Sequence, residues 1–243
     1  GDKIVTIDGE DAFGEKVNNE YVASHLRGKK GTKVTLGIKR GKNDELIDYE
    51  VVRDKIPLNS IDAAFMLDKN VGYIKLDRFA QTSNTEFEES LAKLKAQKMK
   101  SLILDLRGNT GGYLNIAAEL SNQFLKKDMT IVYTEGDKSP KQIFNTDKNG
   151  KFTDGKLIIL IDEGSASASE IVSGAVQDWD RGILIGRRSF GKGLVQRPFN
   201  LPDGSQVRLT TARYYTPTGR CIQRSYEKGS EDYYNEMTKR MKH

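Results

Sequence analysis

The sequence predicts a layered α/β protein preceded by a small β-rich module. From residue 71 onward, short apolar strands alternate with amphipathic helices, the order expected of a sheet covered by helices. Residues 1–54 instead give strand, helix, strand and strand within a short span. A stretch typical of a linker, Pro57 to Asp62, separates the two patterns. We therefore expect two domains, residues 1–54 and residues 55–243.

The strands and helices of the first module follow from alternation and from turn signals. Residues 3–8, 32–39 and 46–52 alternate apolar and polar side chains, as strands with one buried face do. Residues 18–27 can form a short helix, because Gly28 follows as a stop signal.

The second part supplies the layered sheet and its helices. Phe87, Leu91 and Leu94 share one face of a helix predicted over 84–97. A hairpin is predicted over 194–215, turning at 202–204. The remaining predicted strands and helices are 71–76, 102–106, 131–133, 157–161 and 183–185 for strands, and 113–125 and 167–178 for helices.

Composition narrows the chemistry. Of 243 residues 37% are hydrophobic, which suits a soluble globular protein, and no apolar run approaches the roughly 18 residues of a membrane span. One cysteine excludes an intramolecular disulfide, and the only histidines are His25 and His243. The net charge is +5, and positive and negative residues are interspersed along the chain. This pattern disfavours nucleic-acid binding. The aspartates show no metal-ligand spacing, so we predict no metal and no cofactor.

A serine-rich segment, residues 162–170, joins a buried strand to a helix. Ser167 with Glu170 fits a capping box, and a helix N-terminus also offers free N–H groups that stabilise negative charge. Capping and catalysis can coexist here. A serine needs an adjacent base to act as a nucleophile, and neither histidine is well placed, so a lysine is the base to expect.

Two glycine-rich segments have a plain and a functional interpretation. Residues 186–192 match the start of a phosphate-binding loop, but Gly193 replaces the hydroxyl residue and a strand follows, which argues against nucleotide binding. Lys192 is then either a surface lysine or a lysine delivered into a site by its flanking glycines. Residues 106–112 are either a simple strand-to-helix turn or a loop whose N–H groups form an oxyanion hole.

Taken together, these segments resemble the carboxyl-terminal processing peptidases, serine–lysine proteases that carry a PDZ domain. The matching segments are 1–9, 26–28 and 31–34 for the later part of a PDZ domain, and 71–74, 104–112, 165–171, 177–178, 190–196 and 214–219 for the protease core. The resemblance implies a partial PDZ-like domain before a layered core with ββα elements of the crotonase/ClpP type.

The resemblance also implies roles for individual residues. Ser167 becomes the nucleophile, Lys192 the general base and Gln196 the partner that orients the amine. The N–H groups of Ala168 and of Gly111 or Gly112 form the oxyanion hole, and Asp178 supports the site. A lysine acts as a base only when its amine is neutral, and burial among apolar groups favours that form.

The function implied is a serine endopeptidase that cleaves proteins near their C-termini, with substrate tails captured by the PDZ-like module. Proteins or peptides are the partners, a homo-oligomer is compatible with the sequence, and the expected location is extracytoplasmic. The loop that binds a tail's carboxylate would precede residue 1. The alternative is a PDZ-bearing peptide-binding scaffold with an inactive protease-like core.

Overall fold

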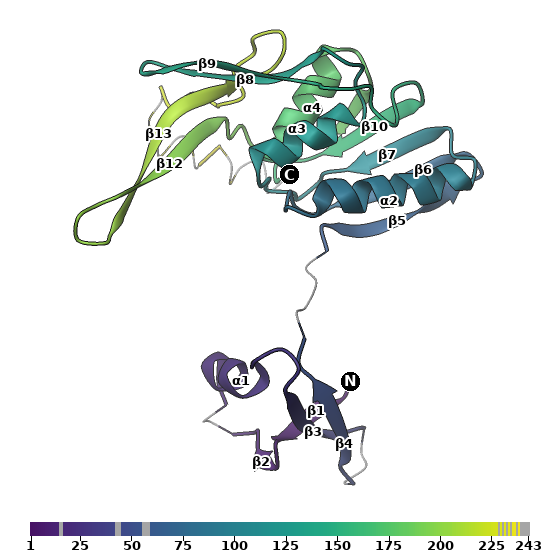
Figure 1. Ribbon diagram of the computed structural model, residues 1–243, viewed down its shortest axis with the longest axis vertical. Coiled ribbons are helices and arrows are strands. Elements are labelled where there is room, and N and C mark those ends of the chain that lie inside the picture. Colours follow the sequence, from purple (N-terminus) through teal and green to yellow (C-terminus); the bar gives the residue numbers. More distant parts are fainter. Residues whose placement is uncertain are drawn as a thin grey trace. The chain divides into compact units, whose positions relative to one another are not determined.

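A computed structural model describes residues 1–14, 17–41, 45–54 and 59–227, together with residues 229, 231, 233, 235, 236 and 238. The chain forms two compact units, residues 1–58 and residues 59–243. Figure 1 shows both as ribbons, coloured along the sequence. We refer to them as unit 1 and unit 2 and describe each by itself.

Unit 1 contains a four-stranded sheet in the order β2-β1-β3-β4 and one helix. The helix starts after Asn18, whose side chain accepts hydrogen bonds from the N–H groups of Glu20 and Tyr21 at 3.0 and 2.9 Å. Val34 and Ile7 are buried in its small core. The elements are β1 (Lys3–Ile7), β2 (Glu10–Asp11), α1 (Asn19–Leu26), β3 (Lys33–Lys39) and β4 (Ile47–Val52).

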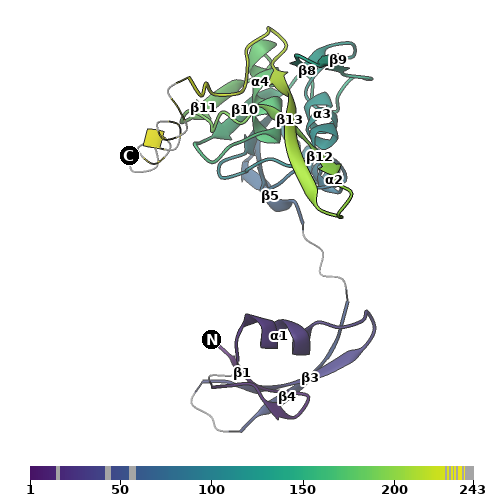
Figure 2. The ribbon, with the colours of Figure 1, turned by 90° about the vertical axis from the view of Figure 1, so that its left-hand side faces the viewer.

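The centre of unit 2 is a five-stranded sheet in the order β11-β10-β7-β6-β5, parallel except for β5. Figure 2 shows β10 and β11 side by side. The strands are β5 (Ile61–Asp68), β6 (Val71–Leu76), β7 (Ser101–Asp105), β10 (Lys156–Ile161) and β11 (Ile183–Gly186).

Three helices of unit 2 pack on this sheet: α2 (Ser83–Ala96), α3 (Leu114–Asn122) and α4 (Ala168–Asp178). Ile74, Leu104 and Ile159 from the strands are fully buried in one cluster with Phe87 and Val172 from the helices. The burial of these strand positions explains why short apolar runs predicted the strands correctly.

A second sheet in unit 2 has the order β12-β13-β8-β9. Its strands are β8 (Thr130–Gly136), β9 (Ser139–Asn145), β12 (Leu194–Asn200) and β13 (Gln206–Tyr215). The long β12–β13 hairpin projects from the body of unit 2 in Figure 1. The hairpin confirms the prediction for 194–215, and β12 confirms that a strand, not the helix of a phosphate-binding loop, follows Lys192.

The structure corrects the sequence interpretation at two strands. Ile61 and Asp62 were assigned to a linker, but they begin β5, because Ile61 pairs with Leu76 on β6. Of the rest of that proposed linker, Pro57 and Leu58 lie outside the described residues, whereas Asn59 and Ser60 directly precede β5. Strand β9 was not predicted, since its sequence is mostly polar and contains Pro140, which is tolerated on an edge strand.

Candidate active site

Ser167 lies at a sharp strand-to-helix turn. Strand β10 ends at Ile161, α4 begins at Ala168, and Ser167 is the residue that caps the helix. Its backbone has φ 56° and ψ −111°, a region that residues with a side chain rarely adopt. The turn therefore presents a half-buried serine directly beside the N–H groups of the first helical turn.

The loop before α4 is joined to the glycine-rich loop after β7. The N–H of Gly108 donates to Oδ1 of Asp162 at 2.8 Å. Ser165 Oγ donates to the carbonyl of Leu106 at 2.8 Å. Both loops start at the carboxyl ends of neighbouring parallel strands, where ligand sites of such sheets form. The two loops, residues 106–112 and 162–167, make one continuous polar surface, which we call the platform.

Asn109 holds the two loops of this platform in place through three hydrogen bonds. Its fully buried side chain donates to the carbonyl of Leu76 at 2.8 Å and accepts from the N–H of Gly111 at 2.8 Å. The backbone carbonyl of Asn109 accepts from the N–H of Ala166 at 3.0 Å. One buried residue thus links β6, the glycine-rich loop and the serine loop through its side chain and its backbone carbonyl.

Gly111 touches the serine loop so closely that no side chain fits. A Cβ placed on Gly111 would lie 2.8 Å from Cβ of Ser167 and 2.9 Å from the nitrogen of Ala168. Its φ of +102° also favours glycine. The structure therefore brings together Ser167, Ala168 and the Gly111–Gly112 pair, which are far apart in the sequence.

The two glycines differ in the state of their N–H groups. Gly111 donates to Asn109, so its N–H is already used. Over residues 59–227, the N–H groups of Gly112 and Ala168 donate no hydrogen bond. Of the two glycines between which the sequence left the choice open, only Gly111 has an N–H that is engaged within residues 59–227, through the Asn109 side chain.

Glu170 connects the serine to the lysine, a role the sequence did not reveal. Its side chain is buried, with 5% of the residue exposed. Oε2 accepts from the N–H groups of Ser167 at 2.8 Å and of Lys192 at 2.9 Å. Oε1 accepts from the N–H of Gly191 at 2.6 Å and from Ser189 Oγ at 2.7 Å. Four donors converge on one carboxylate, so the two loops are held in a fixed relation.

The loop that carries Lys192 is also held from its other side. The N–H of Gly193 donates to Oε1 of Gln223 at 3.0 Å. The carbonyl of Gly191 accepts from the N–H of Arg224 at 3.0 Å. The lysine backbone is therefore clamped between Glu170 and the segment that contains Gln223 and Arg224.

The Lys192 side chain itself is exposed, and so is Gln196 on β12. Neither the Lys192 amine nor the Gln196 amide is hydrogen-bonded to another residue of the described part of the chain. The expectation that apolar side chains surround the lysine amine is not met in this structure.

Asp178 is the last residue of α4, at the end opposite Ser167. It accepts from Thr218 Oγ1 at 2.6 Å and forms an ion pair with Arg220. Burial by itself would raise the pKa of Asp178, but hydrogen bonds from Thr216, Thr218 and Arg220 lower it below its usual value. Asp178 therefore holds the turn after β13, and any support of Ser167 passes through α4.

A charged cluster lies at the end of β7. Asp105 accepts from the Tyr73 hydroxyl at 2.7 Å and forms a bidentate ion pair with Arg107. Burial would raise the pKa of Asp105, but the bonds from Arg107 and Tyr73 prevail and lower it to about 2. The cluster fixes the start of the glycine-rich loop.

The structure describes one of the two histidines. His25 lies on α1 in unit 1, where Nδ1 is 2.8 Å from the carbonyl of Tyr21. His243 lies outside the described residues. Within the described ranges, no group of three His, Cys, Asp or Glu residues is arranged to hold a metal ion. Nor is any described helix long and apolar enough to cross a membrane.

Comparison with known proteins gives the family. The family described as Peptidase family S41 matches residues 70–230. The chain belongs to peptidase family S41. The matched range includes both loops of the platform, with Ser167, and also Lys192.

Members of the family named as C-terminal processing proteases are similar over most of the chain. The carboxyl-terminal-processing protease of a Picosynechococcus strain is 39% identical, over 89% of this chain and 52% of its own length. The carboxy-terminal-processing protease of Bartonella bacilliformis is 40% identical, over 92% of this chain and 51% of its own. This S41 chain thus spans about half of the length of these relatives.

Among solved structures, a photosystem II D1 C-terminal processing protease is similar, with a TM-score of 0.62 and 30% sequence identity. The match covers 92% of this chain and 60% of that protein. The mixed α/β arrangement of this chain is therefore that of an S41 peptidase.

Proposed function

We propose that unit 2 is the catalytic domain of a serine endopeptidase that cuts proteins near their C-termini, with Ser167 as nucleophile and Lys192 as general base. The observation that carries this proposal is the shared carboxylate oxygen of Glu170, which binds the N–H groups of both residues at 2.8 and 2.9 Å. One buried carboxylate thus holds the backbones of a serine and a lysine, the two residue types of a serine–lysine dyad.

In the proposed reaction, the neutral amine of Lys192 accepts the hydroxyl proton of Ser167 as Oγ attacks the scissile carbonyl. The N–H groups of Ala168 and Gly112 stabilise the oxyanion. Lys192 then passes the proton to the leaving amine, which releases the C-terminal fragment. Water, deprotonated by the same amine, hydrolyses the ester on Ser167.

Gln196 is proposed to orient the Lys192 amine once a substrate is bound. Both side chains are exposed in the structure without a bound peptide. A peptide lying over the lysine loop would exclude water and favour the uncharged amine that the reaction requires. Asp178 is proposed to support this site indirectly, by fixing the far end of α4.

Unit 1 is proposed to be a partial PDZ-like module that captures the C-terminal tail of a protein substrate. Its small antiparallel sheet beside one helix is compatible with adding a peptide as a further strand. The function proposed for the whole protein is thus tail-directed proteolysis outside the cytoplasm, without a metal or a cofactor.

Replacing Ser167 and Lys192 separately by alanine tests the dyad. We expect both variants to lose cleavage of a protein with a fluorescent C-terminal tail, and Ser167→Ala also to lose labelling by a fluorophosphonate. Ser205→Ala and Lys138→Ala, which change a serine in the hairpin turn and an exposed lysine, are the matched controls. Full cleavage by either dyad variant would overturn the assignment.

The same assay discriminates the second candidate, a peptide-binding scaffold with an inactive core. A scaffold would bind the tail and cut nothing, whatever residue stands at position 167. The bonded platform around Ser167 favours the enzyme, because four donors on Glu170 are more than capping of α4 requires.

A further inference from the structure

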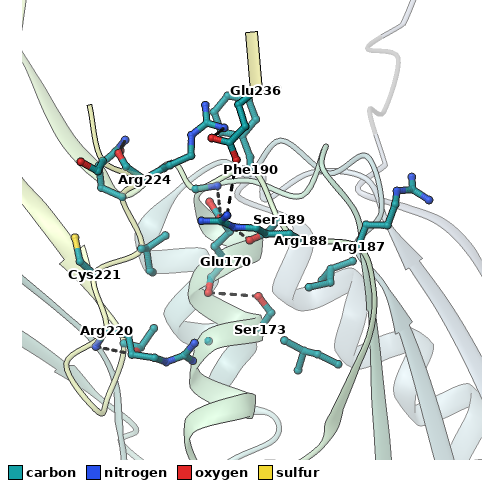
Figure 3. Close-up of a pocket in the computed structure, with 18 of the residues that line it drawn as sticks. Glu170, Ser173, Arg187, Arg188, Ser189, Phe190, Arg220, Cys221, Arg224 and Glu236 are labelled. Carbon is teal, nitrogen blue, oxygen red and sulfur yellow. Dashed lines mark hydrogen bonds and ion pairs between the residues drawn. The ribbon is translucent and has the colours of Figure 1, made fainter. Parts of the chain in front are cut away.

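A cavity of about 970 Å³ lies between α4, β11 and the segment 220–225. Figure 3 shows it in close-up. Neither Ser167 nor Lys192 lines it, but Glu170, Ser189 and Gly191 do, so it adjoins the candidate active site. Its apolar wall includes Leu184, Ile185 and Ile222. A cavity of this size accommodates several residues of a peptide rather than a single ion.

Arg224 at one end of the cavity is a buried cation with unused donors. Only 9% of the residue is exposed. Its guanidinium stacks over the Tyr233 ring at 3.7 Å, and Nη2 donates to the Tyr233 carbonyl at 2.6 Å. Its Nε and Nη1 are buried and have no hydrogen-bond partner in the described part of the chain. Such orphaned donors are costly unless an acceptor reaches them.

One carboxylate lies between Arg224 and a second arginine. Glu236 is 3.4 Å from Nη1 of Arg224 and 3.7 Å from Nη1 of Arg188. A hydrogen bond between a guanidinium and a carboxylate is about 2.7–2.9 Å long, so both contacts are loose. In Figure 3, Arg188 and Arg224 approach Glu236, whereas Arg187 points away. Glu236 thus occupies the position between the two arginines that the carboxylate of a ligand would take.

Strand β11 offers backbone pairing along the same cavity. It is the edge strand of the five-stranded sheet, next to β10. Ile183 and Ile185 on it are 64% and 48% exposed. Exposed apolar side chains on an unpaired edge are typical of a strand that receives another strand. The strand runs toward Gly186, and Arg188 follows two residues later, so a peptide parallel to β11 would end beside the two arginines.

We propose that this cavity binds an extended apolar peptide that ends in a free carboxylate. The peptide backbone pairs with the edge of β11 and its side chains contact the apolar wall. Its terminal carboxylate displaces Glu236 and accepts hydrogen bonds from Arg188 and Arg224. The site lies beside the lysine loop, because the Arg224 N–H donates to the carbonyl of Gly191.

Binding can be measured without the proposed peptidase activity. The protein is the full chain carrying Ser167→Ala, so the proposed cleavage cannot remove the ligand. The ligand is a fluorescent hexapeptide with three apolar C-terminal residues, used as the free acid and as the C-terminal amide. We expect fluorescence anisotropy to give an affinity about tenfold higher for the acid, since a charged acceptor is lost in the amide. Equal affinities would overturn the proposal.

Variants then locate the binding and separate it from tail capture by unit 1. Arg188→Met changes an exposed side chain, so the fold is retained, and it should lower the affinity for the acid about tenfold. Arg224→Met should do the same, and Glu236→Gln should raise the affinity by removing the competing carboxylate. Arg187→Met is the matched control, because Glu163 holds that guanidinium at 2.6 and 2.9 Å. An unchanged affinity in Arg188→Met contradicts the proposed site, even if Arg224→Met does not fold.

Discussion

The backbone N–H groups of Ser167 and Lys192 donate to the same atom, Oε2 of Glu170, at 2.8 and 2.9 Å. The two residues are 25 positions apart in the chain and precede different elements, α4 and β12. A single buried carboxylate therefore sets the relation between the proposed nucleophile and the proposed base. Its charge, and not only its size, matters, because all four of its partners are donors.

Glu170→Gln is expected to abolish most activity and to destabilise unit 2. An amide has one acceptor oxygen, so its NH2 group would face two of the donors that now bind the carboxylate. Leaving buried donors unpaired costs about 1–3 kcal/mol, which should lower Tm and the free energy of unfolding. We would measure kcat/KM on a tail substrate together with urea unfolding.

The control for this variant is Glu163→Gln, in the same loop region. Glu163 pairs with Arg187, whose exposed side chain lets water weaken the ion pair. Glu163→Gln should therefore keep activity and nearly all stability. If both variants behaved alike, the bridging role of Glu170 would be rejected.

Gly111→Ala should disrupt the platform by crowding. The new Cβ would lie 2.7 Å from the carbonyl oxygen of Ala166 and 2.8 Å from Cβ of Ser167. Either the serine or the glycine loop must move, so we expect a large fall in kcat with a smaller fall in Tm.

Gly108→Ala separates crowding from backbone strain. Gly108 has a φ of +72°, but a Cβ there would meet nothing within 4 Å. The substitution should lower the free energy of unfolding by about 1–2 kcal/mol, because of the left-handed backbone alone. It should leave kcat close to that of the unchanged protein. Comparable kcat values in Gly111→Ala and Gly108→Ala would contradict the crowding argument.

Local patterns in the sequence were sufficient to predict most strands and helices and the position of Ser167 at a helix start. Short apolar runs predicted β6, β7 and β10, and buried positions alternate along each of these strands. Strand β5 was missed because turn-forming residues precede it, and its assignment depends on pairing with β6. Local composition does not encode such pairing.

The connections within the site were not predictable, because they depend on contacts between distant segments. Glu170 fits a capping box completely, so nothing local signals that it also binds the N–H of Lys192. Asn109 engages the N–H of Gly111, and this bond depends on how the loop folds. The Lys192 side chain is exposed, whereas its flanking glycines were compatible both with a surface lysine and with a lysine delivered into a site.

Ser167→Gly should give a more stable protein than Ser167→Ala. Ser167 has φ 56° and ψ −111°, which any Cβ makes unfavourable and glycine adopts freely. Backbone strain of this kind is worth about 1–3 kcal/mol. Both variants lack the hydroxyl, so both should be inactive, and thermal unfolding should give the glycine variant the higher Tm. Equal Tm values would show that the turn stores no strain at Ser167.

The buried carboxylate of Asp105 should make the free energy of unfolding of unit 2 depend on pH in the acid range. Its pKa is lowered to about 2 in the folded state, by hydrogen bonds from Arg107 and Tyr73 that outweigh burial. An unfolded aspartate has a pKa of about 3.9, so the unfolded state takes up the proton first as the pH falls. The stabilisation by Asp105 is complete above about pH 4 and is lost as the pH falls toward about 2.

Arg107→Met tests this acid dependence while leaving the carboxylate in place. Arg107 donates to both oxygens of Asp105, so its removal raises the pKa of Asp105 and brings it closer to the unfolded value. The free energy of unfolding should then fall less steeply between about pH 4 and pH 2 than in the unchanged protein. Asp137→Asn, which changes an exposed aspartate, should leave the slope nearly unaltered. Equal slopes in Arg107→Met and the unchanged protein, measured by urea unfolding across this range, would show that the Asp105–Arg107 pair does not control the acid stability.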